Sequence, residues 1–372
     1  MVSTTWPGGA ELYPSLHILG SRQFGGADQF CIRLVRALHE TGEVVTAINR
    51  KGSPVAKALA GVGIEQIHVP LTNQWDVWSL WTIRRLIRAR QACIVQTYLG
   101  RATRLTRLPP AMRAVHIARL GGFYKIDGYY RHAHAWIGNT VGICDYLVRS
   151  GLPASRVYHI GNFVPEPSAV SEAYQAGLRR LYGVHQDAWV LFALGRLIEK
   201  KGFDVLLRAL ACLPREAAGR PVLLMIASEG PSSESLQALA RELGQQDRVR
   251  WLGWQDPPDA FYVLADAFVC PSRHEPLGNV ILEAWNYGLP VVRTRTDGAL
   301  ESIEDGRTSL LCDSGDDQGM AAQIRILLTA PETHRRGLGE AGHDHLREHY
   351  SRAAIVSAYV SLYDRLMAEH GG

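Results

Sequence analysis

Residues 274–290 read HEPLGNVILEAWNYGLP, and they contain two carboxylates, Glu275 and Glu283, separated by seven residues. The short apolar run 267–270 just before them predicts a buried strand. A helix is predicted to begin at about Gly278, because glycine and asparagine open the next apolar segment. Glu275 is therefore expected beyond the carboxyl end of a strand, and Glu283 within the helix that follows.

This junction offers two kinds of recognition. Ligands of open α/β sheets bind beyond the carboxyl ends of the strands. Backbone N–H groups at a helix N-terminus suit an anion, whereas carboxylates accept hydrogen bonds from hydroxyl groups. The combination is the chemistry that a nucleotide-sugar requires, and we expect the N–H groups of Leu277, Gly278 and Asn279 to contact the sugar or the phosphate.

Two further motifs lie at strand-to-helix junctions upstream. Residues 195–202 read GRLIEKKG and follow the apolar run 189–193, and residues 24–28 read FGGAD after the first predicted strand. Together with the Glu-x7-Glu spacing, these motifs resemble those of the retaining glycosyltransferases of family 4, which have the GT-B fold. The three motifs span most of the chain in the order that the family uses.

The resemblance implies an α/β protein with two Rossmann-like domains facing a central cleft. Residues 1–165 are the expected acceptor-side domain, and residues 166–349 the expected nucleotide-sugar-binding domain. A last helix, at about 350–372, is expected to cross back to the first domain. The alternation of apolar runs with helical patterns independently predicts parallel sheets with helices on both faces. Strands are predicted at 16–19, 44–48, 64–69, 94–97, 114–118, 135–138, 157–160, 190–193, 222–226, 249–252, 267–270 and 291–294.

The resemblance also assigns roles in the donor site. Arg196 and Lys201 are expected to neutralise the diphosphate leaving group, with Lys200 as an alternative to its neighbour. Glu275 is expected to accept hydrogen bonds from the donor sugar, and Glu283 from the ribose.

Three other segments complete the expected site. Gly25 and Gly26 let the backbone of their loop approach the diphosphate closely. Gly253 and Trp254, at the end of a predicted strand, are expected beside the base, which is expected to be uracil.

One segment departs from the family pattern. The family often carries a histidine before glycine at the end of a first-domain strand, and Leu120 occupies that position here. Arg119 is the candidate replacement near the reacting carbon, and Asp127 is an alternative. His116 lies too early in the strand to be matched.

Composition limits the remaining possibilities. The 372 residues suffice for two domains, and 47% hydrophobic and 20% charged residues are typical of a globular chain. The sequence has no apolar run of about 18 residues, no signal-peptide pattern at its start and no Cys-x-x-Cys, so a cytoplasmic location is expected. It also has no Asp-x-Asp, so neither a metal nor another cofactor is expected. The crowded His343, His345 and His349 lack the further ligand that a zinc site needs.

Charge is distributed unevenly along the chain. Residues 1–165 hold 19 Lys or Arg and 8 Asp or Glu, whereas residues 166–372 hold 21 and 28. No nucleic-acid-binding motif accompanies the basic half, so nucleic acid is not an expected partner. The segment Trp75–Arg113 combines three tryptophans with many arginines, which favours a peripheral site on an anionic membrane, at the inner face of the cytoplasmic membrane. The alternative is a half-buried helix with its arginines in solvent.

The predicted function is retaining transfer of a sugar from a nucleotide-diphosphate donor, a UDP-sugar, to a saccharide or lipid-linked saccharide. The expected setting is the synthesis of cell-surface polysaccharide or lipopolysaccharide. One alternative is a nucleotide-sugar epimerase or phosphorylase-like enzyme of the same fold. The other is a membrane-associated scaffold of this fold without catalysis.

Overall fold

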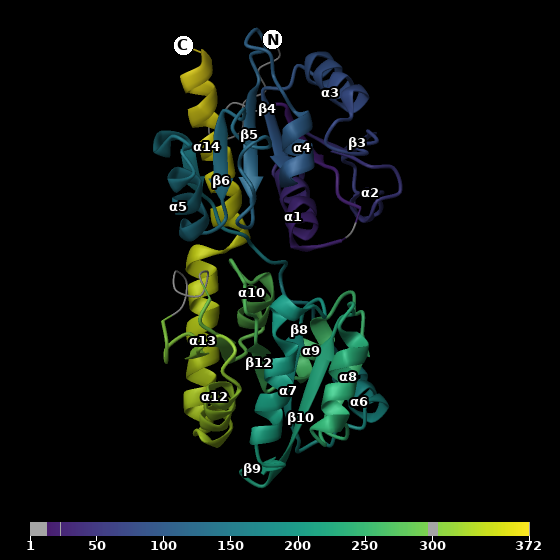
Figure 1. Cartoon of the computed structure of the whole chain (residues 1–372), viewed down its shortest axis with the longest axis vertical. Coiled ribbons are helices and arrows are strands. Elements are labelled where there is room, and N and C mark those ends of the chain that lie inside the picture. The colour runs from purple at the N-terminus through teal and green to yellow at the C-terminus, as the bar shows by residue number, and fades with distance from the viewer. Residues whose placement is uncertain (1–12, 23, 297–303, 372) are drawn as a thin grey trace. The chain divides into compact units, whose positions relative to one another are not determined.

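The computed structural model describes residues 13–22, 24–296 and 304–371. These residues form two compact units (Figure 1). Unit 1 contains the described residues up to Phe163 together with those from Ser351 onward, and unit 2 is Val164–Tyr350.

Unit 1 is built on a seven-stranded parallel sheet in the order β3-β2-β1-β4-β5-β6-β7. Its strands are β1 (Ser15–Leu19), β2 (Val45–Asn49), β3 (Glu65–His68), β4 (Ile94–Tyr98), β5 (Val115–Leu120), β6 (Ala135–Gly138) and β7 (Val157–His159). Its helices are α1 (Gly26–Glu40), α2 (Pro54–Ala58), α3 (Val77–Ala89), α4 (Leu99–Leu105), α5 (Val141–Arg149), the 3-10 helix η1 (Ala154–Arg156) and α14 (Arg352–Gly371).

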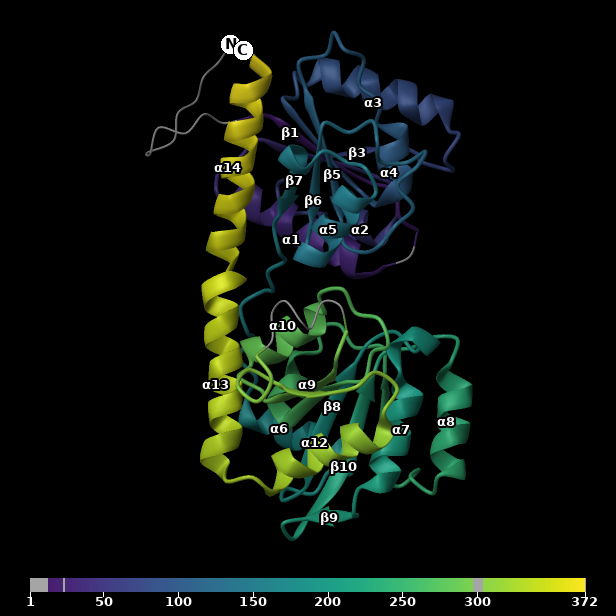
Figure 2. The ribbon, with the colours of Figure 1, turned by 60° about the vertical axis from the view of Figure 1, so that its left-hand side comes forward.

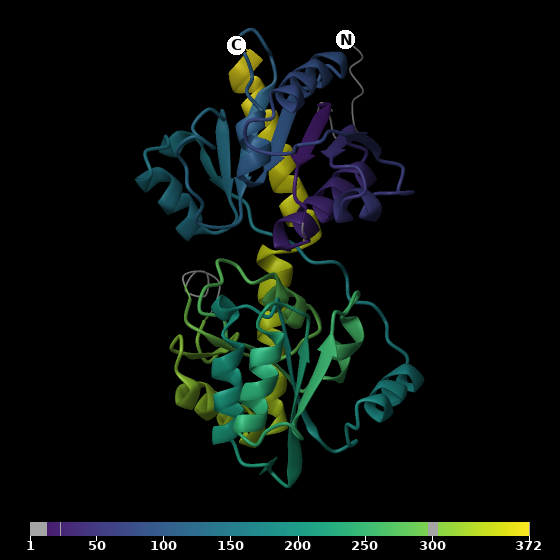
Figure 3. The same cartoon turned by 45° about the vertical axis from the view of Figure 1, so that its right-hand side comes forward.

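Both faces of this sheet are covered, which explains why its central strands β1, β4 and β5 are buried along their whole length. Residues of α1 and α14 join one buried cluster with the strands, and residues of α3 and α4 join another. Figure 3 shows α1, in purple, beside the yellow helix α14. A side-chain cap helps to begin α3, because the Asp76 carboxylate accepts a hydrogen bond of 2.9 Å from the backbone N–H of Ser79.

The last helix packs into the core of unit 1, as predicted. The ring of Tyr359 lies 6.2 Å from that of Phe30 on α1. The hydroxyl of Tyr363 donates a hydrogen bond of 2.9 Å to Oε1 of Gln96 on β4. The helix that ends the chain is therefore part of the interior of the unit that the chain builds first.

Unit 2 contains a second parallel sheet, in the order β11-β10-β8-β12-β13-β14, with the short β9 antiparallel to β10. Its strands are β8 (Trp189–Leu194), β9 (Glu216–Ala217), β10 (Arg220–Ala227), β11 (Val249–Gly253), β12 (Ala267–Cys270), β13 (Val291–Thr294) and β14 (Leu310–Cys312). Its helices are α6 (Glu172–Leu181), the 3-10 helix η2 (Glu199–Lys201), α7 (Phe203–Cys212), α8 (Ser233–Glu242), α9 (Asp259–Leu264), α10 (Asn279–Asn286), α12 (Asp317–Thr329) and α13 (Glu332–His349).

Helices again cover both faces of the sheet. Residues of α7, α8 and α12 pack in one buried cluster, and these helices lie together in Figure 2. Residues of α6, α9, α10 and α13 pack in a cluster on the other face. Among the described residues, no helix combines the length and apolar character needed to cross a bilayer.

The structure confirms every predicted strand to within one or two residues. It adds two strands that the sequence did not predict, β9 and β14. Both are only two or three residues long, so neither carries enough of an apolar pattern to stand out.

Candidate active site

The strand order of unit 2 determines where its candidate site lies. Its first strand, β8, has β10 on one side and β12 on the other. The connections from β8 and β12 therefore diverge at a topological switch point, where open α/β sheets bind ligands. The loops after these two strands carry Arg196, Lys201 and Glu275.

Lys201 and Glu275 form an ion pair at this point. The Lys201 ammonium donates a hydrogen bond to Oε2 of Glu275, and their side chains are only 19% and 13% exposed. Oε2 also accepts a bond of 3.3 Å from the Ser272 hydroxyl. Burial by itself lowers the pKa of Lys201, but the Glu275 carboxylate outweighs burial, and the pKa is raised.

The two loops are clamped together by residues that the sequence analysis did not single out. The Arg273 guanidinium binds the Asp204 carboxylate through two parallel hydrogen bonds of 2.8 and 2.7 Å. The backbone N–H of Arg273 donates to the carbonyl of Lys200 at 2.9 Å. Gly202 has a φ of +66°, and a Cβ there would lie 2.1 Å from the carbonyl oxygen of Pro271. Only glycine fits this approach, and the approach brings Lys201 to Glu275.

A buried arginine is linked to the backbone of Glu275 through one threonine hydroxyl. Arg293, on β13, is 1% exposed, and it donates a hydrogen bond of 2.8 Å to Oγ1 of Thr296. That hydroxyl donates one of 3.1 Å to the backbone carbonyl of Glu275. Burial lowers the pKa of Arg293, whereas the Cys270 thiol and the Glu275 carboxylate oppose that shift. Arg293 was not predicted from the sequence, because arginine is seldom buried and no local pattern marks this one as an exception.

The helix after Glu275 presents its N-terminus here. Gly278 precedes α10 with a φ of +79°, and no side chain caps the helix. A Cβ at Gly278 would lie 2.8 Å from Ile281 and 3.1 Å from Cγ of Glu275, so the backbone is tightly wound at this turn. Leu277 is buried, and Asn279 is partly buried as the first residue of α10.

Glu283 lies on α10 and is half-buried, in keeping with its apolar neighbours in the sequence. Its Oε2 accepts a hydrogen bond of 3.1 Å from the hydroxyl of Tyr262 on α9. The Tyr262 ring stacks on that of Tyr287, with centroids 5.3 Å apart. Tyr262 is a further residue of this region that was not predicted from the sequence.

The remaining predicted residues of unit 2 follow neighbouring strands. Arg196 is exposed directly after β8, and Gly253 ends β11 with a φ of +66°. The carbonyl of Gly253 accepts a hydrogen bond of 2.7 Å from the backbone of Ser228 after β10. Trp254 follows β11 directly and is 53% exposed. All these residues therefore share the carboxyl edge of one sheet.

Gly25 and Gly26 belong to unit 1, where they are exposed at the start of α1. The carbonyl of Gly25 accepts hydrogen bonds of 3.0 Å from the backbones of Asp28 and Gln29. Burial raises the pKa of the Asp28 carboxyl, although a hydrogen bond from Ser21 opposes the shift. This glycine pair therefore begins the first turn of a helix, beyond the carboxyl end of β1.

Arg119 lies inside unit 1 rather than on its surface. Its side chain is 3% exposed, its guanidinium lies 3.9 Å from the centroid of the Phe30 ring, and it donates to Oδ1 of Asn162. The alternative Asp127 is exposed and pairs with Arg131 at 2.5 Å. His116 is fully buried and bonded to the Thr97 hydroxyl at 2.9 Å.

Within 13–22, 24–296 and 304–371, no three His, Cys, Asp or Glu side chains converge as metal ligands would. His345 and His349 do lie together, with ring centroids 4.6 Å apart.

Two parallel sheets with this strand order, and a last helix returning to the first, define the chain as a two-unit α/β protein of GT-B type. Residues 178–345 match the family described as glycosyl transferases group 1. The lipopolysaccharide core biosynthesis glycosyltransferase LpsE of Rhizobium meliloti is 34% identical over 339 residues, covering 91% of this chain and 95% of the relative. LpsD of the same organism is 33% identical, covering 93% and 96%. The chain therefore belongs to the glycosyl transferases group 1 family and is a glycosyltransferase.

Solved structures agree on the fold. A glycosyltransferase from Rickettsia africae superposes with a TM-score of 0.83 at 18% identity, covering 96% of this chain and 99% of that one. Anabaena Alr3699/HepE in complex with UDP and glucose gives a TM-score of 0.81 at 18% identity, covering 94% and 99%. WaaG, a glycosyltransferase involved in lipopolysaccharide biosynthesis, gives 0.69 at 18% identity, with the same coverage. The GT-B fold predicted from the motifs is confirmed.

Proposed function

We propose that this glycosyltransferase moves a sugar from a UDP-sugar to a saccharide or lipid-linked saccharide, with retention of the anomeric configuration. The observation that carries the proposal is the Lys201–Glu275 pair at the switch point of the second sheet. It presents a cation for a diphosphate beside a carboxylate for sugar hydroxyls. The UDP bound in the HepE structure supports the choice of base, and the names of LpsE and LpsD support an acceptor in lipopolysaccharide core synthesis.

In this proposal unit 2 binds the donor. Arg196 and Lys201 stabilise the negative charge that develops on the diphosphate as the glycosidic bond breaks. Glu275 accepts hydrogen bonds from the sugar, and the N–H groups of 277–279 contact the sugar or phosphate at the start of α10. Glu283, oriented by Tyr262, accepts hydrogen bonds from the ribose hydroxyls.

Three further roles complete the donor site. The backbone of Gly253 reads the base, and Trp254 stacks on it. Unit 1 supplies the acceptor side, and its Gly25–Gly26 turn approaches the diphosphate. Because Arg119 is buried against Phe30 and donates to Asn162, its role is to position the segment after β7 rather than to touch the reacting carbon. These positive side chains and the helix N-terminus provide the electrostatic stabilisation, so no metal is required.

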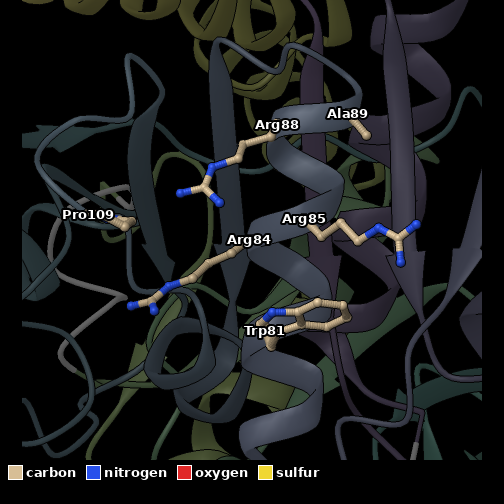
Figure 4. A pocket seen from close by; sticks show the side chains of 6 residues that line it. All are labelled: Trp81, Arg84, Arg85, Arg88, Ala89 and Pro109. Carbon is tan, nitrogen blue, oxygen red and sulfur yellow. The ribbon is translucent and has the colours of Figure 1, made fainter.

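We also propose that unit 1 docks on the inner face of an anionic membrane through α3. Trp75, Trp78 and Trp81 are 69%, 58% and 57% exposed, which is unusual for such large apolar side chains. Figure 4 shows Trp81, with three arginines, projecting from this helix around a depression of about 480 Å³. The lining residues are Trp81, Arg84, Arg85, Arg88, Ala89 and Pro109. Tryptophan beside arginine suits a membrane interface, where one buries apolar area and the other meets lipid phosphates.

The experiment that tests the catalytic proposal is incubation with a panel of UDP-, GDP- and ADP-sugars, with and without an acceptor extract. Release of UDP from one donor by the wild type, dependent on the extract and lost in Glu275→Gln, is expected. Donor binding without turnover under all conditions would favour the non-catalytic scaffold. Turnover of a GDP- or ADP-sugar alone would overturn the choice of base and leave the transferase reaction intact.

A further inference from the structure

Three arginines gather at the carboxyl edge of the sheet of unit 1. Arg22 follows β1, Arg50 follows β2, and Arg101 lies in the first turn of α4, directly after β4. Since β1 pairs with both β2 and β4, these three loops are neighbours, and β1/β4 is the topological switch point of this sheet. We refer to Arg22, Arg50 and Arg101 as the arginine triad.

Backbone carbonyls, rather than acidic side chains, hold the arginine triad in place. The carbonyl of Leu71 accepts from Nη1 of Arg50 at 2.7 Å and from Nη1 of Arg101 at 3.2 Å. Nη1 of Arg101 also donates to the carbonyl of Gly20 at 3.2 Å, and Nη2 of Arg22 to that of Thr72 at 3.4 Å. Each guanidinium has five N–H donors, so these bonds leave donors on every member for a ligand.

The loop that supplies these carbonyls is tightly constrained. Leu71 is buried with a φ of +46°, a left-handed conformation that a leucine rarely adopts. A Cβ at Gly20 would lie 3.0 Å from the Leu71 side chain, so the loops after β1 and β3 are in close contact. The carbonyl that two of the arginines share is therefore held firmly, as a built site requires.

Negative charge near the arginine triad is scarce. No acidic side chain lies within 4.0 Å of a triad guanidinium in the part of the chain that the structure describes. The nearby carboxylate of Asp76 is already engaged by the Thr72 hydroxyl at 2.8 Å and the Ser79 hydroxyl at 2.7 Å. Burial, followed by the like charges of Arg22 and Arg101, lowers the pKa of Arg50, and the Asp76 carboxylate opposes this shift only in part. Three cations that repel one another, with one carboxylate nearby and none in direct contact, are stabilised by a further anion between them.

We propose that the arginine triad binds an anionic group, a phosphate monoester or a carboxylate, on the acceptor saccharide. Guanidinium groups bind both anions through paired, charge-assisted hydrogen bonds. The acceptor substrate of this transferase is accordingly an acidic saccharide, selected by its charge as well as by its sugar hydroxyls. The inference rests on the proposed function, in which unit 1 takes the acceptor.

The test uses the full-length protein with its donor site filled by UDP. Binding of glucose 6-phosphate, galacturonic acid and glucose is measured by saturation-transfer NMR and calorimetry. We expect the wild type to bind at least one acidic probe and to bind neutral glucose at least about tenfold more weakly. The two acidic probes distinguish phosphate from carboxylate as the recognised group.

Variants assign the binding to the arginine triad. Arg50→Gln and Arg101→Gln should each weaken the acidic probe about tenfold while the affinity for UDP stays constant. Arg149→Gln, which removes an exposed charge at the end of α5, is the matched control and should bind as the wild type does. Arg22→Gln lies at an exposed position, so it should weaken binding of the acidic probe less and should not disturb folding. Arg50→Lys keeps the positive charge but loses the paired hydrogen bonds that a guanidinium makes.

The possible failures can be told apart. Equal binding of glucose and the acidic probes would overturn the inference, and so would triad variants that bind the probes normally. Weaker UDP binding in Arg50→Gln or Arg101→Gln would instead assign the arginine triad to the donor diphosphate. If the wild type binds no UDP, the proposed donor chemistry fails, whereas the probe titration still tests the triad directly.

Discussion

The Lys201 ammonium and the Glu275 carboxylate are 74 residues apart in the sequence and hydrogen-bonded in the fold. Neither partner is more than one-fifth exposed. The residue proposed for the diphosphate and the residue proposed for the sugar therefore form one electrostatic unit. A change at either position should alter both the charge and the geometry of the other.

Loss of a cation from the donor site should cripple turnover. Arg196→Ala and Lys201→Ala each remove a charge proposed to stabilise the leaving diphosphate. Each should raise the activation free energy of turnover by on the order of 3 kcal/mol, and kcat should fall accordingly. Lys200→Ala removes an exposed neighbouring charge and is the control. The measurement is the steady-state rate of UDP release by the wild type and by each of the three variants. Normal rates in Arg196→Ala and Lys201→Ala, or a loss confined to Lys200→Ala, would move the diphosphate contact elsewhere.

The ion pair should also contribute to stability, in a way that depends on pH. Glu275→Gln leaves the poorly exposed Lys201 charge without its partner, which should cost about 3 kcal/mol. Because the folded pKa of Lys201 is raised, the stabilisation is present below about pH 10 and is lost as the pH rises through the folded pKa. The coupling energy between the two side chains is measured by urea unfolding at pH 8 and above pH 10. The four proteins compared are the wild type, Lys201→Met, Glu275→Gln and the double variant Lys201→Met/Glu275→Gln. Additive effects at pH 8 would show that the pair does not stabilise the fold.

Transfer should not depend on a divalent metal. The proposed stabilisation comes from Arg196, Lys201 and the N-terminus of α10. The rate of UDP release should therefore be unchanged in excess EDTA after extensive dialysis. Complete loss of activity that Mn²⁺ restores would show that a metal site exists.

Much of the fold was predictable because buried parallel strands are continuous apolar runs. Runs such as 190–193 and 267–270 therefore indicated their strands without ambiguity. The strand order was not predictable from such runs, and it is this order that brings the loops after β8 and β12 together. The donor-site residues could be proposed from motif spacing, but their pairing depends on the register of strands far apart in the sequence.

The supporting residues show a second limit. Arg293 and the Arg273–Asp204 clamp act through contacts between distant parts of the chain, which the local sequence pattern does not predict. Arg119 shows the converse, since a charged residue at a strand end suggests a ligand contact, yet the fold buries it against Phe30. Whether a strand-end side chain faces a ligand or the core depends on the helices that cover it, here α1 and α14.

A buried histidine should make unit 1 sensitive to acid. His17, at the centre of β1, is hydrogen-bonded to the Tyr98 hydroxyl at 2.8 Å, and burial lowers its pKa to about 3. Its neutral form is favoured in the fold, so this contribution to stability is complete above about pH 6.5 and is lost as the pH falls toward 3.

The corresponding measurement compares wild type with His17→Gln. Well below pH 6.5 and above the folded pKa of about 3, the free energy of unfolding of the wild type should fall relative to the variant by about 1.4 kcal/mol per pH unit. Denaturant unfolding at several pH values gives this difference. A gap between the two proteins that is the same at every pH would mean that His17 contributes packing alone.

The α3 surface should bind anionic vesicles with two separable components. Each well-placed arginine should contribute about 1 kcal/mol near an anionic surface, and this part should weaken steeply with salt, because exposed charges are screened within about 8 Å at physiological ionic strength. The exposed tryptophans should add a salt-resistant part through buried apolar area. Co-sedimentation with anionic and neutral vesicles over a range of salt concentrations measures both.

Charge reversal at Arg84, Arg85 and Arg88 should release the protein without changing its affinity for UDP. Reversal of three exposed arginines of unit 2, Arg180, Arg241 and Arg325, makes the same change in net charge and should leave binding largely intact. If the wild type ignores anionic vesicles even at low salt, or if both triple variants lose binding equally, α3 is a solvated face and the membrane proposal fails.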